Sequence, residues 1–174
     1  AVHPSLSVAH LDGLTDTPST AFTWLAALVW PLTLAEGAAL GARLNTPADW
    51  LRVIADTARL KARLPQLEQS GLTPSGVCAL LDGLSPDALR AATLLAQPPV
   101  ASERVRRYLA EWWSVAPRLR GSDLLELGVP AGPAVGEALR ALRKARLDGE
   151  TNNMEDEQRI ARKWATQSYF DAQP

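Results

Sequence analysis

The chain has 174 residues, of which 47% are hydrophobic, and its formal net charge is −1. This length and composition are ordinary for a folded protein of one or two small domains, so they exclude a chain that is disordered throughout. The near-zero net charge excludes a uniformly basic coat for nucleic acid. No apolar run approaches about 18 residues, so no membrane-spanning helix is expected. The single Cys78 excludes an internal disulfide and favours a cytoplasmic protein.

Proline and glycine signals divide the first half of the chain into helices. Two apolar helices are expected at 19–30 and 33–43, on either side of Pro31. Three further helix starts are indicated where a capping hydroxyl precedes a proline. These pairs are Thr46-Pro47, Thr73-Pro74 and Ser85-Pro86. The helices that follow them are expected to end near residues 67, 82 and 97.

The helix expected at 47–67 has an apolar stripe at helical spacing. The stripe consists of Trp50, Leu51, Ile54, Ala58, Leu60, Leu64 and Leu67, whereas Arg52, Asp56, Arg59 and Arg63 lie off it. Pro65 is expected to bend or break the end of this helix. Cys78 lies in an apolar run and is expected in the core.

Pro98-Pro99 forces a break, which we take as the boundary between a helical body region, 1–98, and a helical tail region, 99–174. In the tail, a helix is expected to start at Ser102-Glu103 and to run through Trp113. A short helix near 123–127, a glycine-proline hairpin, a helix at 133–147 and a last helix at 154–170 follow. No segment shows the alternation of a strand. The sequence therefore predicts an all-α bundle of about nine or ten helices.

Arrangements of residues for catalysis or metal binding are nearly absent from the sequence. We find no phosphate-binding loop, zinc-ligand spacing, His-Cys pair or Asp-x-Asp pair for Mg²⁺. His3 and His10 are expected at the surface. The acidic run 155–157 is interpreted as the solvated first turn of the last helix, where the helix dipole favours negative charge. We therefore predict no catalytic residue, metal or cofactor in this chain.

Basic residues concentrate in one part of the chain. No Lys or Arg precedes Arg43, whereas the stretch 103–146 has nine basic and five acidic residues. The basic residues are Arg104, Arg106, Arg107, Arg118, Arg120, Arg140, Arg143, Lys144 and Arg146. Such a local excess attracts phosphate groups even when the whole chain is nearly neutral.

The segment 120–149 combines glycines, prolines and this positive charge. Glycines recur at 128, 132 and 136, and Pro133 opens a helix whose first N–H groups can face an anion. In that helix Arg140, Arg143 and Lys144 share one side, while Leu139, Leu142 and Ala145 lie towards the other. A hairpin before a basic helix resembles the way in which helix-hairpin-helix modules contact a nucleic-acid backbone. The predicted RNA-binding residues are Arg118, Arg120, Gly132, Gly136, Arg140, Arg143 and Lys144.

Two alternatives remain open at this point. The glycines can serve close helix packing, and the three basic residues can form an ordinary solvated face. Trp112 and Trp113 are adjacent in a helix, so one can lie in the core while the other meets solvent, a partner or a nucleobase, but packing in the core or between helices is favoured. The first 42 residues have no Lys or Arg, and the chain has six Trp residues. Both features also fit an all-helical protein-interaction or dimerisation module.

Motifs in the second half resemble the family of tRNA nucleotidyltransferases, which includes CCA-adding enzymes and poly(A) polymerases. The matching motifs are Gly-Ser-Asp-Leu-Leu-Glu-Leu-Gly at 121–128, Gly-Pro-Ala-Val-Gly at 132–136 and Leu-Asp-Gly at 147–149. The family usually has a proline at the position of Ala131, whereas this chain has Pro130 one place earlier, so a different path of the hairpin is expected. The part before residue 99 is similar to the family's helical body in general pattern.

This resemblance implies the carboxy-terminal body and tail of a bacterial enzyme of the class II type. In that family the body and tail hold the elbow of the tRNA, while a separate head with metal-binding aspartates adds nucleotides to the 3′ end. The implied partners are tRNA and the head and neck of the same parent protein, and Mg²⁺ is expected in the head. Whether CCA, CC, A or poly(A) is added is determined by the head and neck.

Overall fold

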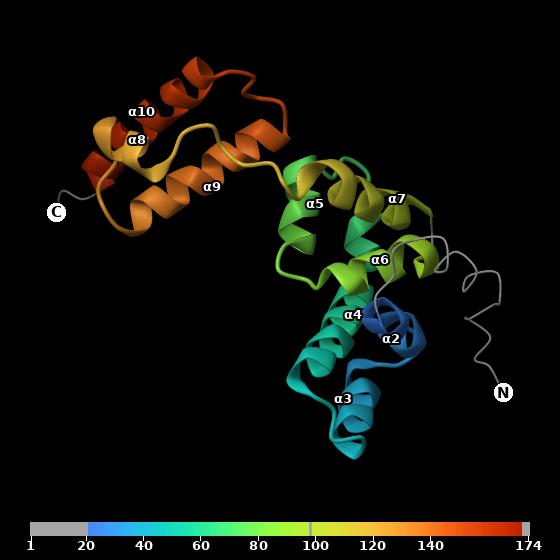
Figure 1. The fold of residues 1–174 in the computed structure, drawn as a ribbon. Helices are drawn as coiled ribbons and strands as arrows, with labels where there is room; N and C mark the ends of the chain where they lie inside the picture. Colours follow the sequence, from blue (N-terminus) through green and yellow to red (C-terminus); the bar gives the residue numbers. More distant parts are fainter. Residues whose placement is uncertain (1–20, 98, 172–174) are drawn as a thin grey trace. The chain divides into compact units, whose positions relative to one another are not determined.

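The structure, a computed structural model, describes residues 21–97 and 99–171, with side chains as far as Thr166. These residues form nine α-helices and one π-helix, without any strand (Figure 1). The predicted all-α class is therefore confirmed. His3, His10 and the start of the first expected helix lie outside the described residues. No helix in the described part is long and apolar enough to cross a membrane.

The chain divides into two compact units. Of the described residues, the first unit comprises those up to Leu72 together with those from Gly76 to Trp113, and the second comprises Thr73–Ser75 and those from Ser114 onward. The domain boundary expected at 98/99 stays a prediction.

Six α-helices and the π-helix belong wholly or mostly to the first unit. They are α2 (Ala21–Val29), α3 (Leu34–Arg43), α4 (Ala48–Leu67), α5 (Pro74–Leu81), α6 (Pro86–Leu95), α7 (Pro99–Arg107) and η1 (Tyr108–Trp112). Side-chain caps fix two of the starts. The hydroxyl of Thr33 accepts a hydrogen bond from Glu36 N, and the hydroxyl of Ser85 accepts one from Ala88 N, both at 3.2 Å.

Three details of these helices differ from the expectation. The hydroxyl of Thr46 does not cap α4, because it donates a hydrogen bond to Gly41 O at 2.9 Å. Pro65 does not break α4, because it lies in the last turn and removes one intrahelical hydrogen bond near an end at Leu67. α7 begins at Pro99 rather than at Ser102, because a proline at the first helical position has no N–H to leave unpaired.

The core of the first unit includes Leu60, Leu67, Val77, Leu81 and Val105, which are at most 1% exposed. Cys78 is buried among them, as predicted. The predicted pattern of α4 is wrong in two respects. Trp50 and Leu51 of the expected stripe are 40% and 39% exposed, whereas Asp56 is only 2% exposed.

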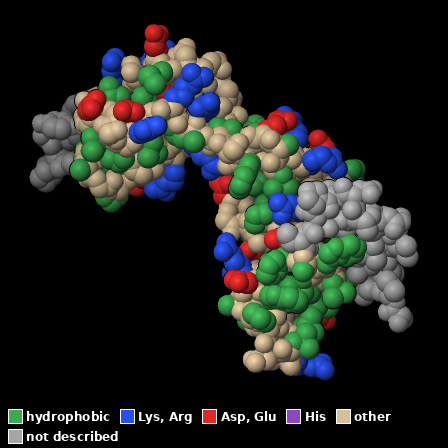
Figure 2. All heavy atoms as spheres, in the orientation of Figure 1, with side chains coloured by type: hydrophobic (Ala, Val, Ile, Leu, Met, Phe, Trp, Pro, Cys, Tyr) green, Lys and Arg blue, Asp and Glu red, His purple; other side chains and the backbone are tan. Residues whose placement is uncertain are grey.

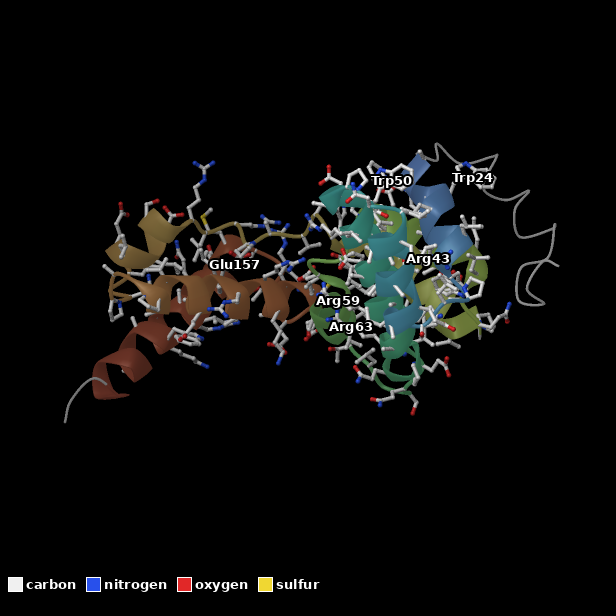
Figure 3. The ribbon with its side chains drawn as sticks, turned by 90° about the horizontal axis from the view of Figure 1, so that it is seen from below. Trp24, Arg43, Trp50, Arg59, Arg63 and Glu157 are labelled. Carbon is white, nitrogen blue, oxygen red and sulfur yellow. The ribbon has the colours of Figure 1, made fainter. Side chains whose placement is uncertain are left out.

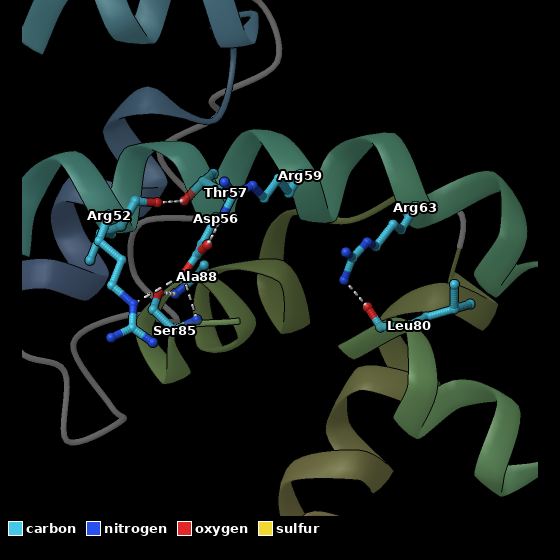
Figure 4. A network of polar contacts seen from close by, with 9 residues as sticks. Arg52, Asp56, Thr57, Arg59, Arg63, Leu80, Ser85 and Ala88 are labelled. Atoms are coloured by element: carbon cyan, nitrogen blue, oxygen red, sulfur yellow. Dashed lines mark hydrogen bonds and ion pairs between the residues drawn. The ribbon is translucent and has the colours of Figure 1, made fainter. Parts of the chain in front are cut away.

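Asp56 is buried because polar partners surround its carboxylate (Figure 4). One oxygen accepts a hydrogen bond from Ser85 N at 2.9 Å. Arg59 and Arg52 approach the carboxylate at 3.1 Å and 3.7 Å. Asp56 therefore ties α4 to the start of α6.

The second unit contains α8 (Gly121–Glu126), α9 (Pro133–Leu147) and α10 (Met154–Asp171). Its core consists of Leu119, Leu124, Val129, Ala138, Leu142 and Ala161, against which Leu139 packs. The inward face predicted for α9 is thus confirmed, since Leu142 and Ala145 are buried. By the same helical periodicity, the residues of α9 on the opposite face point away from this core.

Candidate nucleic-acid interface

The bend before α9 lies at the surface of the second unit. Val129 anchors its start, being 2% exposed and donating a backbone hydrogen bond to Leu124 O at 2.9 Å. Residues 130–133 are exposed. Gly132 precedes the helix with φ at +109°, a backbone conformation that side chains with a Cβ disfavour. The start of α9, where an α-helix leaves N–H groups without helical partners, is therefore reachable from outside.

Arg140 lies at the middle of α9 on its exposed side, and its side chain runs back toward the amino-terminal end. Its Nε donates a hydrogen bond to Gly136 O at 3.1 Å. A Cβ at Gly136 would lie 4.0 Å from Nη2 of Arg140, so the guanidinium passes over the bare glycine. The positive charge of Arg140 thus lies closer to the amino-terminal end of α9 than its own Cα does.

Lys144 continues this face one helical turn later. Its side chain is exposed, and no described residue forms a hydrogen bond or an ion pair with it. Glu137 is the acidic residue of α9, and no ion pair joins it to Arg140 or Lys144 within the described part of the chain. The exposed face of α9 therefore presents two cations whose charge no acidic partner in direct contact cancels.

Arg143 and Arg146 have partners in the segment before α8. Arg143 is half-buried, and its Nε donates to Val115 O at 2.9 Å. Arg146 Nη1 donates to Ala116 O at 2.6 Å. Both side chains hold this segment against α9. Arg143 thus has a structural role, and its predicted binding of phosphate stays a prediction.

Glu157 holds the next part of the same segment (Figure 3). One carboxylate oxygen accepts hydrogen bonds from Arg118 N at 2.8 Å and Leu119 N at 3.0 Å. Glu157 is 1% exposed, so the interpretation of this residue as part of a solvated acidic turn is wrong. Two backbone donors compensate the burial of the carboxylate.

Arg118 and Arg120 are placed by these backbone contacts. Arg120 N donates to Asp123 Oδ2 at 2.7 Å at the start of α8. The side chains of Arg118 and Arg120 are exposed, and no described side chain pairs with them. They are thus accessible to an anion. Their role in RNA binding stays a prediction.

Charge in the second unit is segregated along the sequence. The stretch 114–146 has six basic and three acidic residues, whereas 147–158 has five acidic and no basic residues. Basic and acidic side chains are both visible on the surface of this unit (Figure 2). No group of three or more potential metal ligands occurs in the described part of the chain. The stretch 114–146 is thus suited to bind an anion.

The residues that carry the family resemblance mainly build the second unit. Gly128 and Gly149 have φ of +90° and +77°, which favours glycine, and Leu124 and Leu142 are fully buried. Asp148 accepts hydrogen bonds from Ser75 N at 2.9 Å and Ser75 Oγ at 2.6 Å. The matching motifs therefore specify the fold that positions the basic face.

The first unit has a different kind of surface. Six large apolar side chains between residues 24 and 51 are at least 38% exposed. They are Trp24, Leu28, Leu34, Leu44, Trp50 and Leu51. Figure 2 shows apolar side chains over α2 and α3. Figure 3 shows the positions of Trp24 and Trp50. This surface is apolar rather than cationic.

The Trp pair at the end of the first unit is split by η1. Trp112 is half-buried beneath the guanidinium of Arg107, whose Cζ lies 4.8 Å from the ring centroid. Trp113 is 60% exposed. The expectation that the pair packs between helices is therefore wrong for Trp113. The sequence gives no signal for the π-helix that places it.

Comparisons with known proteins find one informative similarity. No family model matches the chain, and neither does any solved structure. A segment of 85 residues is 38% identical to the A-adding tRNA nucleotidyltransferase of Geobacter sulfurreducens. The match covers 47% of this chain and 9% of that relative's length. Over this segment the chain is related to a tRNA nucleotidyltransferase.

Proposed function

We propose that this chain binds structured RNA, with tRNA as the ligand, through the exposed face of α9 and the bend before it. The observation that carries the proposal is the pair of Arg140, laid over Gly136, and Lys144, in the last turn of the same helix, both exposed and unpaired with any described acid. Arg118, Arg120 and the amides near Gly132 supply further contacts. The similarity to a tRNA nucleotidyltransferase supports this choice of ligand.

The chemistry of an RNA helix suits such a surface. A-form RNA exposes phosphates and 2′-hydroxyls along a wide, shallow minor groove, so proteins recognise it by shape and by backbone contacts. The start of α9 offers N–H donors to a phosphate, and the cations farther along the helix add positive charge. The α9 face needs no base-specific contact to bind in this way.

The wider proposal is that the chain is the carboxy-terminal part of a cytoplasmic enzyme that adds nucleotides to tRNA. The chain would hold the elbow of the tRNA while a head and neck outside this chain, with Mg²⁺ in the head, act on the 3′ end. Holding the far end of the substrate would contribute to catalysis by positioning. The chain alone would transfer no nucleotide.

The test compares two double variants that remove the same charge from the same unit. Arg140→Gln with Lys144→Gln changes the proposed face, whereas Arg162→Gln with Lys163→Gln changes two exposed cations of α10. Affinity for labelled tRNA is measured by fluorescence anisotropy at fixed salt. The first variant should lose about ten-fold in affinity and the second less than about two-fold. Equal losses would contradict a specific α9 site.

The apolar surface of the first unit favours a second candidate function, a protein-interaction or dimerisation module. Leu28, Leu34 and Leu44 are 69%, 57% and 68% exposed, which is unusual for large aliphatic side chains grouped in one region. Sedimentation of the chain over a range of concentrations tests this candidate. A mass that rises with concentration and returns to the monomer in Leu28→Lys would support it, and a constant monomer mass would exclude self-association.

A further inference from the structure

A cavity in the first unit has the composition of a ligand site. It has a volume of about 420 Å³, within the range of small-molecule pockets. Its floor consists of Leu84, Leu89 and Tyr108, which are 8%, 2% and 6% exposed. Its rim includes the exposed side chains of Arg90 and Trp113. The cavity is thus apolar at the base, with an indole and a guanidinium at the entrance.

The π-helix η1 determines which tryptophan reaches this cavity. Trp113 N donates to Tyr108 O at 2.9 Å, five residues earlier. In a regular α-helix, Trp112 would occupy that position above Tyr108. The additional residue therefore brings Trp113 to the cavity and leaves Trp112 beside Arg107. Short π-helical insertions are rare and often occur at functional sites.

Polar contacts fix the walls of the cavity without filling it. Tyr108 Oη donates to Asp82 Oδ1 at 2.8 Å, which holds the ring of the floor in place. Arg90 Nη1 lies 3.4 Å from Asp87 Oδ1, and the Arg90 side chain is 44% exposed. A guanidinium has five N–H donors, so Arg90 keeps donors for a ligand at the entrance.

The walls favour a planar ligand that bears a negative charge. The indole of Trp113 offers a flat face for stacking, and such stacking on a nucleobase contributes about 1–3 kcal/mol. A bare anion would gain nothing from the apolar floor, and an aliphatic chain would gain nothing from Arg90. A nucleobase joined to a phosphate uses both features.

We propose that this cavity binds an unpaired nucleobase of RNA, stacked on Trp113, with its phosphate near Arg90. This inference rests on the proposed RNA-binding function and adds a second contact, formed by the first unit. The α9 face would bind the phosphates of a helical region, and the cavity would bind one unstacked base. The Trp113 part of the second contact should not depend on salt, because stacking releases no counterions, whereas the phosphate contacts of α9 and of Arg90 should.

The binding test uses the full chain and an unstructured oligoribonucleotide. Trp113→Ala should weaken binding about ten-fold and leave its salt dependence unchanged. Trp113→Phe should restore most of the affinity, because an aromatic face remains. Trp24→Ala is the matched control, since Trp24 is an exposed indole of the same unit, 38% exposed. An affinity that is unchanged in Trp113→Ala would overturn the proposal.

A second measurement separates this proposal from the function of α9. Each of the six Trp residues gives one indole N–H signal in a nitrogen-15 NMR spectrum, and Trp113→Phe identifies that of Trp113. Adenosine 5′-monophosphate should shift the Trp113 signal, also in the Arg140→Gln, Lys144→Gln variant, whereas inorganic phosphate should not.

The outcomes of this titration distinguish failure of the cavity proposal from failure of the α9 proposal. A shift with the mononucleotide in a chain that does not bind tRNA would support the cavity and refute the α9 proposal. Binding of tRNA with no shift at Trp113 would refute the cavity alone. A shift with a leucine-rich peptide and none with the nucleotide would also refute it, in favour of a protein ligand.

Discussion

Helices α4 and α9 both have cations at helical spacing, yet the structure uses them differently. In α4, Arg52 and Arg59 pair with the buried carboxylate of Asp56, and Arg63 donates to Leu80 O (Figure 4). In α9, Arg140 lies over a glycine and Lys144 extends from the surface. The α4 cations stabilise the first unit, and the α9 cations remain available to a ligand.

Helical spacing alone therefore does not assign a role to a basic residue. What separates the two sets of cations is a partner from another part of the fold or a buried acid, which Arg140 and Lys144 lack among the described residues. Even within α9, Arg143 resembles the α4 residues, because its side chain is half-buried and bonded to Val115 O. Variants of these residues should therefore fall into two classes, one that affects stability and one that affects binding.

The largest effect is expected for Asp56→Ala, which tests the structural class. The change leaves the buried Ser85 N–H without its acceptor and leaves Arg52 and Arg59 without their partner. The free energy of unfolding of the first unit should fall by about 3 kcal/mol. Urea denaturation measures this loss. Asp49→Ala, in the exposed first turn of α4, is the control and should change it by less than about 0.5 kcal/mol.

Glu157→Ala should have the next largest effect, in the second unit. It removes the acceptor of two backbone N–H groups, at Arg118 and Leu119. We expect a loss of about 2 kcal/mol, less than for Asp56, because water can replace the acceptor at the part-buried Arg118 N. Hydrogen exchange should be faster at both amides. Unchanged exchange there would contradict the structural role of Glu157.

These two acids also show the limits of prediction from sequence. Pro133 and Asp148-Gly149 mark the ends of α9 by local signals, and the predicted bounds agree with the structure. The burial of Asp56 depends on Ser85, 29 residues away, and that of Glu157 depends on Arg118, 39 residues away. Helical periodicity contains no information on such distant partners.

For the candidate site too, the features that follow from local patterns were predictable and those that depend on distant partners were not. The exposed bend and the outward direction of Arg140 and Lys144 follow from the position of the apolar residues on α9. The attachment of Arg143 to Val115 does not, because it depends on the path of the segment before α8. The π-helix at Tyr108–Trp112 has no counterpart in sequence pattern, so the exposure of Trp113 could not be foreseen.

A smaller effect separates Arg143 from Lys144 on the same helix. Arg143→Gln should lower the stability of the second unit by about 1 kcal/mol, because the hydrogen bond to Val115 O is weakened. Lys144→Gln should leave stability unchanged and weaken tRNA binding. Thermal unfolding and anisotropy are measured on both variants. A lower stability for Lys144→Gln than for Arg143→Gln would contradict this division between structural and binding cations.

The smallest effect concerns Lys61 of α4. Burial lowers the pKa of Lys61 below its ordinary value of 10.5, opposed by the charge of Glu36, and Nζ donates to Leu32 O at 2.7 Å. Because the folded pKa is the lower one, the unfolded chain binds more protons between the two pKa values. The contribution of Lys61 to stability should therefore rise as the pH increases toward 10.5. Urea titrations of the wild type and Lys61→Gln should show their stability difference moving in favour of the wild type over this range.

The sharpest test of RNA binding by α9 is the salt dependence of the affinity for tRNA. The logarithm of the association constant is measured against the logarithm of the salt concentration for the wild type, for Arg140→Gln with Lys144→Gln, and for Arg162→Gln with Lys163→Gln. If α9 contacts phosphates, the first double variant should reduce the magnitude of the slope by about two, and the second should leave it unchanged. Equal slopes in all three proteins would contradict the claim that the α9 face binds RNA.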